Sequence, residues 1–196
     1  MKDITLLIAH PDDECIFLWA FLPRVKRIVC ASNDANNPDR LWCKERGRCL
    51  MDVGELLGAQ VICFNENSEF YRLRTRNGEL KKLAQDIAWV LRDAEIIATH
   101  NAWGEYGHLD HLLCNLIGRT VQAETHCELL CTDIAVTDDP AWLPIKRWAQ
   151  TRISIPGPTE HEIDRPLFDR IKAIYDSRGC WTWSYEPVEH CRVFSL

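Results

Sequence analysis

The sequence has no apolar stretch that approaches the roughly 20 residues of a membrane-spanning helix. It also has no long run of Lys and Arg, and its formal net charge at pH 7 is -6. Nucleic-acid binding needs clustered cationic side chains that neutralise phosphates, so this absence argues against nucleic acid as the main partner. The first residues, MKDITLL, are typical of a strand rather than of a signal peptide.

Two motifs that bind metals or cofactors are missing as well. None of the ten cysteines forms a CxxC pair, so a structural zinc site built from cysteines is not expected. The glycine-rich pattern GxGxxG of dinucleotide-binding proteins is also absent. Cys30 and Cys63 lie inside apolar runs, where a thiol acts as a small buried hydrophobe. We therefore expect mostly reduced cysteines and a cytoplasmic protein.

The length and composition are those of one globular domain. The chain has 196 residues, of which 46% are hydrophobic and 27% are charged. A chain of this length is long enough for one core and too short to divide comfortably into two, so we predict a single domain over residues 1–196.

Apolar runs alternate with amphipathic stretches of helical length. The runs predict strands over Ile4–Ala9, Arg27–Ala31, Gln60–Phe64, Glu95–Thr99 and Glu128–Thr132. The amphipathic stretches predict helices over Trp42–Leu57, Glu79–Arg92 and Leu112–Val121. Strand and helix in alternation predict an α/β fold with a parallel sheet and right-handed crossovers. Later in the chain, RISIPGP predicts a strand and a loop, and His161–Tyr175 is expected to be mostly helical.

The segment HPDDE follows the first predicted strand directly. It places His10, Asp12, Asp13 and Glu14 within five residues, and only Pro11 separates the histidine from the acids. Carboxylates this close repel one another unless a cation lies among them. Imidazole and carboxylate are both good zinc ligands, so a divalent metal is the simplest candidate.

A second polar segment, HNAWGEYGHLDH, follows the fourth predicted strand. Ligands of parallel α/β sheets bind outside the carboxyl ends of the strands, so both segments are expected at the same edge. Taken alone, PDDE fits an exposed acidic turn, and HLDH fits a helix start in which Asp110 favours the helix dipole. Together they offer the mixed imidazole and carboxylate ligands of a catalytic zinc site.

These residues resemble the N-acetylglucosaminyl-phosphatidylinositol de-N-acetylase family, which includes the LmbE-like zinc-dependent deacetylases. The family motifs AHPDDE and GHxDH match Ala9–Glu14 and Gly107–His111, and YDSRG from Tyr175 is similar to a weaker family pattern. The resemblance implies a Rossmann-like, three-layer α/β fold without a dinucleotide. It also implies hydrolysis of an N-acetyl or similar N-acyl group on an amino sugar or glycoconjugate.

The resemblance assigns roles to residues of both segments. It implies a zinc ion held by His10, Asp13 and His111, and Asp12 as the general base that takes a proton from the attacking water. Tyr106 and His108 would support the developing charge on the amide oxygen, and His108 or protonated Asp12 would pass a proton to the leaving amine. Asp110 would orient an imidazole. Iron(II), cobalt or manganese could occupy the same ligands, because ligand type selects a metal only loosely.

The expected substrate contacts differ in part from the family pattern. Arg46 matches an arginine of the family, but Cys49 stands where relatives often carry glutamate, and Arg178 replaces a glutamine. These altered residues at the expected rim of the site, Cys49 and Arg178, suggest the same reaction on a different substrate. An aromatic ring could stack on a sugar face, and the candidates that follow predicted strands or lie in loops are Trp103, Trp181 and Trp183.

Three functions stay open at this stage. The favoured one is a deacetylase of an amino-sugar conjugate, with a homo-oligomer possible. The second is a metal-dependent amidase acting on a non-sugar amide, such as an intermediate of natural-product synthesis. The third is a sugar-conjugate binding protein with an idle metal site, against which the intact Asp12 counts.

Overall fold

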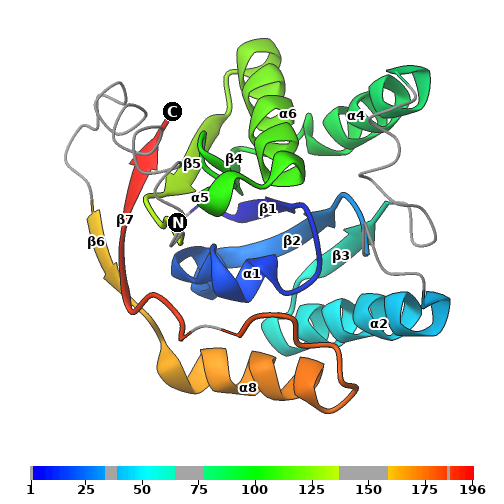
Figure 1. The fold of residues 1–196 in the computed structure, drawn as a ribbon. Helices are drawn as coiled ribbons and strands as arrows, with labels where there is room; N and C mark the ends of the chain where they lie inside the picture. Colours follow the sequence, from blue (N-terminus) through cyan, green and yellow to red (C-terminus); the bar gives the residue numbers. More distant parts are fainter. Residues whose placement is uncertain (1, 34–38, 65–76, 137–158, 185) are drawn as a thin grey trace.

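The computed structural model describes residues 2–33, 39–64, 77–136, 159–184 and 186–196. One seven-stranded sheet lies between two layers of helices (Figure 1). The sheet order is β3-β2-β1-β4-β5-β7-β6. The strands are β1 (Ile4–Ile8), β2 (Val25–Cys30), β3 (Gln60–Cys63), β4 (Ile96–Thr99), β5 (Glu128–Thr132), β6 (Thr159–Glu162) and β7 (His190–Ser195). The predicted three-layer α/β fold is confirmed.

The five strands that were predicted form the parallel part of the sheet. β1 pairs with β2 and β4, β2 pairs with β3, and β4 pairs with β5, all in parallel. β7 runs antiparallel to both β5 and β6, so the sheet is mixed at one edge. All five residues of β1 are buried, as the continuous apolar run ITLLI requires for a strand covered on both faces.

Two pairs of long helices cover the two faces of the sheet (Figure 1). One pair is α2 (Arg40–Leu57) with α8 (Arg165–Asp176), and the other is α4 (Asn77–Leu91) with α6 (Leu109–Thr125). Successive residues of a strand point to opposite faces. Accordingly, Leu6 and Ile8 belong to one hydrophobic cluster, with Leu50 of α2, and Leu7 belongs to the other, with Ile87 of α4.

Three short elements carry or adjoin the polar segments. They are α1 (Asp13–Ile16), the 3₁₀ helix η1 (Trp19–Arg24) and α5 (Gly104–Gly107). None of the described helices has the length and apolar content needed to cross a membrane.

The predicted boundaries agree with the structure to within two residues for the five parallel strands. The helix expected over His161–Tyr175 is wrong at its start, because β6 extends to Glu162 and α8 begins only at Arg165, where Asp164 accepts the Leu167 N–H as N-cap. The helix expected over Leu112–Val121 is longer at both ends, because α6 begins at Leu109, directly after its N-cap His108, and ends at Thr125. The strand predicted within RISIPGP lies outside the described residues.

Candidate metal centre and active site

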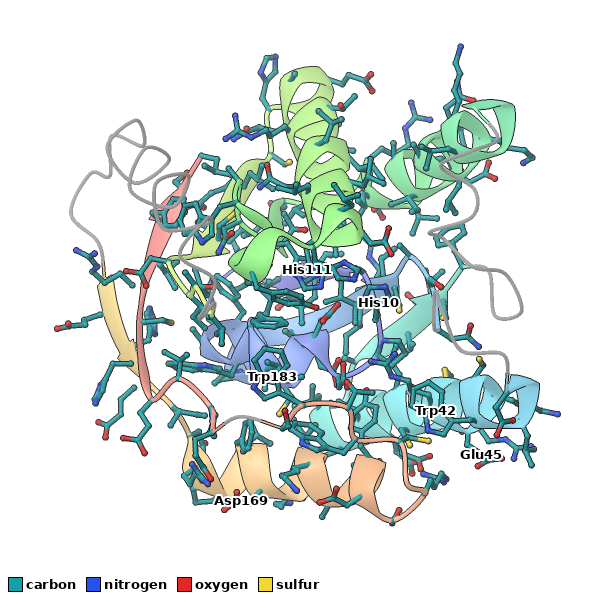
Figure 2. All side chains as sticks on the ribbon, in the orientation of Figure 1. His10, Trp42, Glu45, His111, Asp169 and Trp183 are labelled. Atoms are coloured by element: carbon teal, nitrogen blue, oxygen red, sulfur yellow. The ribbon has the colours of Figure 1, made fainter. Side chains whose placement is uncertain are left out.

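The two polar segments meet at the carboxyl ends of β1 and β4, which are adjacent in the sheet. β1 leads into His10 and α1, and β4 leads into α5 and the start of α6. The sheet order reverses between these two strands, and such a switch point is where open α/β sheets bind ligands. Figure 2 shows the labelled side chains of His10 and His111 side by side near this edge, and their ring centroids are 5.8 Å apart.

The backbone makes two unusual turns to bring these side chains together. Asp12 has φ of 88° and Glu105 has φ of 53°, both in the left-handed region that non-glycine residues rarely adopt. Backbone strain of this kind persists only where the surroundings hold the residue in place, and it is concentrated at functional sites. Asp12 and Glu105 are both about 1% exposed.

His111, on the first turn of α6, has one ring nitrogen engaged and one without a partner. Its Nδ1 lies 2.7 Å from Glu105 Oε2, so the ring donates a hydrogen bond from Nδ1 to this carboxylate. Its Nε2 is buried and has no hydrogen-bond partner among the described residues, and it lies 3.5 Å from Asp13 Oδ1. An imidazole that donates one N–H to a carboxylate and has a free lone pair beside an anion is arranged as a metal ligand.

His10 is arranged in a similar way. Its Nε2 lies 3.2 Å from Asp110 Oδ2, and its Nδ1 lies 3.5 Å from Asp13 Oδ2. Burial lowers the pKa of His10, but the hydrogen bonds with Asp110 and Asp13 outweigh burial and raise it to about 9. The position between His10 and Asp13 therefore favours a positive charge, either as a proton or as a bound cation.

His100 packs against His111 but has a different hydrogen-bond pattern. The two rings stack with centroids 3.8 Å apart, and His100 Nδ1 also lies 3.1 Å from Glu105 Oε2. The Ala9 N–H donates to His100 Nε2 at 3.1 Å, which requires the lone pair that a metal would need. Burial lowers the pKa of His100, but Glu105 and Asp13 raise it to about 10, which conflicts with a free lone pair. A cation at Asp13 would offset the part of this shift that Asp13 causes and so favour the neutral ring that the Ala9 contact requires.

Two sets of three side chains bring one possible ligand atom each within 4.8 Å of one another. One set is His10, His108 and His111, and the other is Asp13, His100 and His111. The ligands predicted from the sequence, His10, Asp13 and His111, draw on both sets and stay a prediction. The buried, unpartnered Nε2 of His111 and the mixed nitrogen and oxygen donors fit a zinc ion or a similar divalent metal.

Asp12, the predicted base, is held at both carboxylate oxygens. Arg46 Nη2 donates to Oδ1 at 2.7 Å, and the Thr182 hydroxyl donates to Oδ2 at 2.6 Å. Burial, together with the charge of Asp13, raises the pKa of Asp12 above its usual value, although the Arg46 charge and the hydrogen bonds from Thr182 and Arg46 lower it in part. Thr182 is solvent-exposed, so the Asp12 carboxylate lies just beneath the surface.

His108 and Tyr106 are half-buried beside the proposed ligands. The His108 ring centroid lies 5.0 Å from that of His10 and 4.7 Å from that of His111. Its Nδ1 accepts the Asp110 N–H, which leaves the proton of the neutral ring on Nε2. Burial, with the neighbouring histidines, lowers the pKa of His108 to about 3. Burial also raises the pKa of the Tyr106 hydroxyl, so both groups are neutral hydrogen-bond donors at pH 7.

The three candidate tryptophans lie in different places. Trp103 is 4% exposed, donates its indole N–H to the Ile134 carbonyl and stacks on Phe194, so its position in the core does not support the predicted sugar contact. Trp181 packs on α8 against Phe168 and Tyr175.

Trp183 contacts aromatic side chains beside the candidate metal centre. It is half-buried, and its ring contacts those of Phe17 and Tyr106, with centroids 5.2 and 5.9 Å apart (Figure 2). Trp183 therefore forms an aromatic wall with Tyr106 next to the candidate metal centre.

Arg46 also lies differently from the expectation. It was predicted to contact substrate, but it is 5% exposed and its guanidinium pairs with Asp12. The two positions that depart from the family pattern contact each other, because Arg178 Nη1 lies 3.9 Å from Cys49 Sγ. Arg178 Nη1 also pairs with Asp52 of α2 at 2.5 Å.

Glu105 is a residue of the candidate site that the sequence patterns did not indicate. It accepts hydrogen bonds from both His100 and His111, and the Asn101 N–H donates to its other oxygen at 3.1 Å. Burial raises its pKa, but the two histidines outweigh burial and hold it at about 2. The available signal was its position between the end of β4 and the segment GHLDH. An acid in a turn that glycines flank is, however, more often exposed to solvent.

No family model and no curated protein matches this chain. Solved structures match its fold. A deacetylase of teicoplanin biosynthesis, solved as a complex with teicoplanin, has a TM-score of 0.62 and 11% identity, and the match covers 98% of each chain. N,N'-diacetylchitobiose deacetylase from Pyrococcus horikoshii has a TM-score of 0.57 and 15% identity, over 92% of this chain and 71% of that one.

The same fold is also found with another activity. GalB, the 4-carboxy-2-hydroxymuconate hydratase from Pseudomonas putida KT2440, has a TM-score of 0.54 and 15% identity, over 100% of this chain and 96% of that one. At these identities the likeness shows the fold, which is the LmbE-like α/β fold that the sequence motifs imply. The reaction has to be argued from the side chains of the site.

Proposed function

We propose that this protein is a metal-dependent N-deacetylase that acts on an amino sugar or a conjugate of one. The observation that carries the proposal is the paired arrangement of two histidines around Asp13. His10 and His111 each direct one ring nitrogen at Asp13 and the other at a second carboxylate, Asp110 and Glu105 respectively. The deacetylase activity named for two proteins of the same fold supports this reading.

The residues that would hold the metal are His10, Asp13 and His111. When bound, zinc supplies Lewis acidity and lowers the pKa of a coordinated water toward about 7. Asp110 accepts a hydrogen bond from His10 Nε2, and Glu105 accepts one from His111 Nδ1. These hydrogen bonds fix the orientation of each ring and make its other nitrogen a stronger metal ligand. Iron(II), cobalt or manganese remain alternatives to zinc, because the same ligand types accept them.

Asp12 takes a proton from the attacking water and delivers it to the leaving amine. Burial and Asp13 raise the pKa of Asp12, which suits a base that accepts a proton near pH 7, and the Arg46 charge opposes this shift and favours the ionised form. His108 is suited to a different task. With its pKa near 3 and its proton on Nε2, it donates a hydrogen bond to the amide oxygen rather than transferring a proton. Tyr106 provides a second neutral donor.

The substrate would be bound by side chains around the open side of the site. We propose that Trp183, together with Tyr106, packs against a sugar ring, since both rings are half-buried and adjacent. Thr182 is an exposed residue next to Asp12, so it is a further candidate for substrate contact. Trp181 and Arg46 contribute less directly. The ring of Trp181 packs against α8, and the charge of Arg46 is paired with Asp12.

A cytoplasmic location is part of the proposal. All ten cysteines are free, and nine of them are buried. Thiols in this number persist most readily in a reducing compartment.

The deciding experiment measures acetate release by the metal-loaded protein from a panel of amides. The panel contains N-acetylglucosamine, N,N'-diacetylchitobiose, a glycopeptide that carries N-acetylglucosamine, and an N-acetylated amine without a sugar. We expect acetate from at least one sugar substrate, and loss of that activity after chelation.

Turnover of the non-sugar amide alone would favour the second candidate, an amidase of natural-product chemistry. The observation that favours it is the departure from the family pattern at Cys49 and Arg178, which contact each other, while Arg178 also pairs with Asp52. Metal binding without turnover of any of these amides would contradict the deacetylase proposal.

A further inference from the structure

The backbone N–H of Asp12 is held by two fully buried side chains that the proposed reaction does not use. Tyr175 Oη accepts this N–H at 2.9 Å, and Glu14 Oε2 accepts it at 2.9 Å. The Tyr175 hydroxyl in turn donates to Glu14 Oε1 at 2.8 Å. Tyr175 and Glu14 are both 0% exposed, so no solvent competes for these hydrogen bonds.

This three-way contact joins distant parts of the chain. Tyr175 comes from the last turn of α8, whereas Glu14 is in α1, next to the proposed metal ligand Asp13. The contact is made at the one residue of HPDDE whose backbone is left-handed, with φ of 88° and ψ of -21°. Such a conformation costs free energy for an aspartate and needs compensating contacts.

The backbone conformation decides where the Asp12 carboxylate points. Asp12 and Asp13 are neighbours, yet the carboxylate of Asp12 meets Arg46 and Thr182, whereas that of Asp13 meets the histidines. In this way two adjacent acids are separated into a base and a ligand.

We propose that Tyr175 and Glu14 are positioning residues for Asp12, which hold its backbone so that the carboxylate faces the reacting water. The inference rests on the proposed function, since it assigns these residues to the base of that reaction. It extends the active site to α8 on the opposite helix layer from α6. If the role of Tyr175 were merely structural, loss of its hydroxyl would lower the stability of the protein but would not act on the reaction through Asp12.

The Tyr175→Phe variant tests the inference, because it keeps the buried ring and removes only the hydroxyl. We expect kcat of the metal-loaded enzyme to fall by up to about 10²-fold, the effect of a catalytic group misplaced by about 1 Å. KM and metal content should stay at wild-type values. Glu14→Gln, which replaces one acceptor oxygen with a donor, should lower kcat in the same way.

Two comparisons separate positioning from stability. In an Asp12→Asn background, Tyr175→Phe should change kcat by less than about 2-fold, because residues that act through one another are not additive. Ile171→Val is the matched control, since Ile171 is a fully buried residue of α8 without polar atoms, and it should leave kcat unchanged. Equal losses from Tyr175→Phe in both backgrounds would overturn the proposal.

A measurement without turnover keeps this inference separate from the proposed function. Amide hydrogen exchange at Asp12 should become roughly 2- to 12-fold faster in Tyr175→Phe, the effect of losing one net hydrogen bond. The amides of Leu6 and Leu7 in β1 should keep their protection. Unchanged exchange at Asp12 would overturn the positioning role, even if the wild type proves to be a deacetylase. Faster exchange would support the contact, even if no amide in the panel is hydrolysed.

Discussion

The guanidinium of Arg46 lies 2.7 Å from Asp12 Oδ1, and both side chains are buried. A buried pair of this kind is costly to break, because removal of one partner leaves an uncompensated charge. The pair also connects α2 to the proposed catalytic base. Arg46 was expected to contact the substrate, but in the structure it is paired with the proposed base.

Asp12→Asn should retain the metal but lose about 10² to 10⁴-fold in turnover, the usual contribution of a positioned general base. Asparagine is suited to this test because it tolerates the left-handed backbone and can still accept the hydrogen bond from Arg46. It cannot accept a proton near neutral pH. Elemental analysis and steady-state kinetics on the same preparation measure the two properties.

The neighbouring acid provides the comparison for this variant. Asp13→Asn should lose metal affinity as well as turnover, because Asp13 contacts both His10 and His111. If metal-loaded Asp12→Asn turned over substrate at a normal rate, Asp12 would not be the base. If it lost the metal, Asp12 would have to be counted as a ligand.

His111→Ala should abolish tight metal binding, because it removes one of the three proposed ligands. The fold should persist, since the ring lies at the sheet edge and its hydrogen bond goes to Glu105, another side chain of the candidate site. Metal titration and circular dichroism provide the two measurements. His190→Ala, at an exposed histidine of β7, is the control and should bind metal normally. One equivalent of tightly bound metal in His111→Ala would show that the second segment is not part of the metal site.

The sequence could indicate those parts of the candidate site that follow β1 and β4 in the chain. HPDDE and GHLDH come directly after, or soon after, β1 and β4, and parallel strands deliver their carboxyl ends to one edge. The contacts to α8 and the segment after it could not be predicted in this way. Tyr175 and Thr182 reach Asp12 from more than 160 positions away in the sequence, and the packing of α8 beside α2 and α1 brings them there.

The tryptophans show a similar limit. Trp103 follows β4 by a few residues, which made it a candidate for the site, but its ring turns inward and stacks on Phe194 of β7. β6 was not predicted because TEHE contains no apolar side chain, and β7 was not predicted either. Without β7 the burial of Trp103 could not be foreseen.

Glu105→Gln should weaken metal binding by about 10- to 100-fold, as is typical for the loss of a carboxylate that orients a ligand. Glutamine has the same length, but its uncharged oxygen is a weaker acceptor for the N–H of His111 and His100. Competition with a chelator of known affinity measures the change. Glu124→Gln, on the far part of α6, is the control and should bind metal as the wild type does. An unchanged affinity in Glu105→Gln would mean that His111 is held in place without Glu105.

Arg46→Gln separates the two roles considered for this arginine. If Arg46 acts through Asp12, removal of its charge raises the pKa of Asp12, because the arginine lowers that pKa in the wild type. The base must be ionised to work, so the acid limb of the kcat/KM profile should move to higher pH, and kcat at pH 7 should fall. If Arg46 instead holds the sugar, KM should rise and the acid limb should stay in place. The control is Arg48→Gln, which removes an exposed arginine of α2 that pairs with Glu45. Its pH profile of kcat/KM and its KM should match those of the wild type. A rise in KM alone would return Arg46 to the substrate contact expected from the sequence and leave the ionisation of Asp12 to Thr182 and the metal.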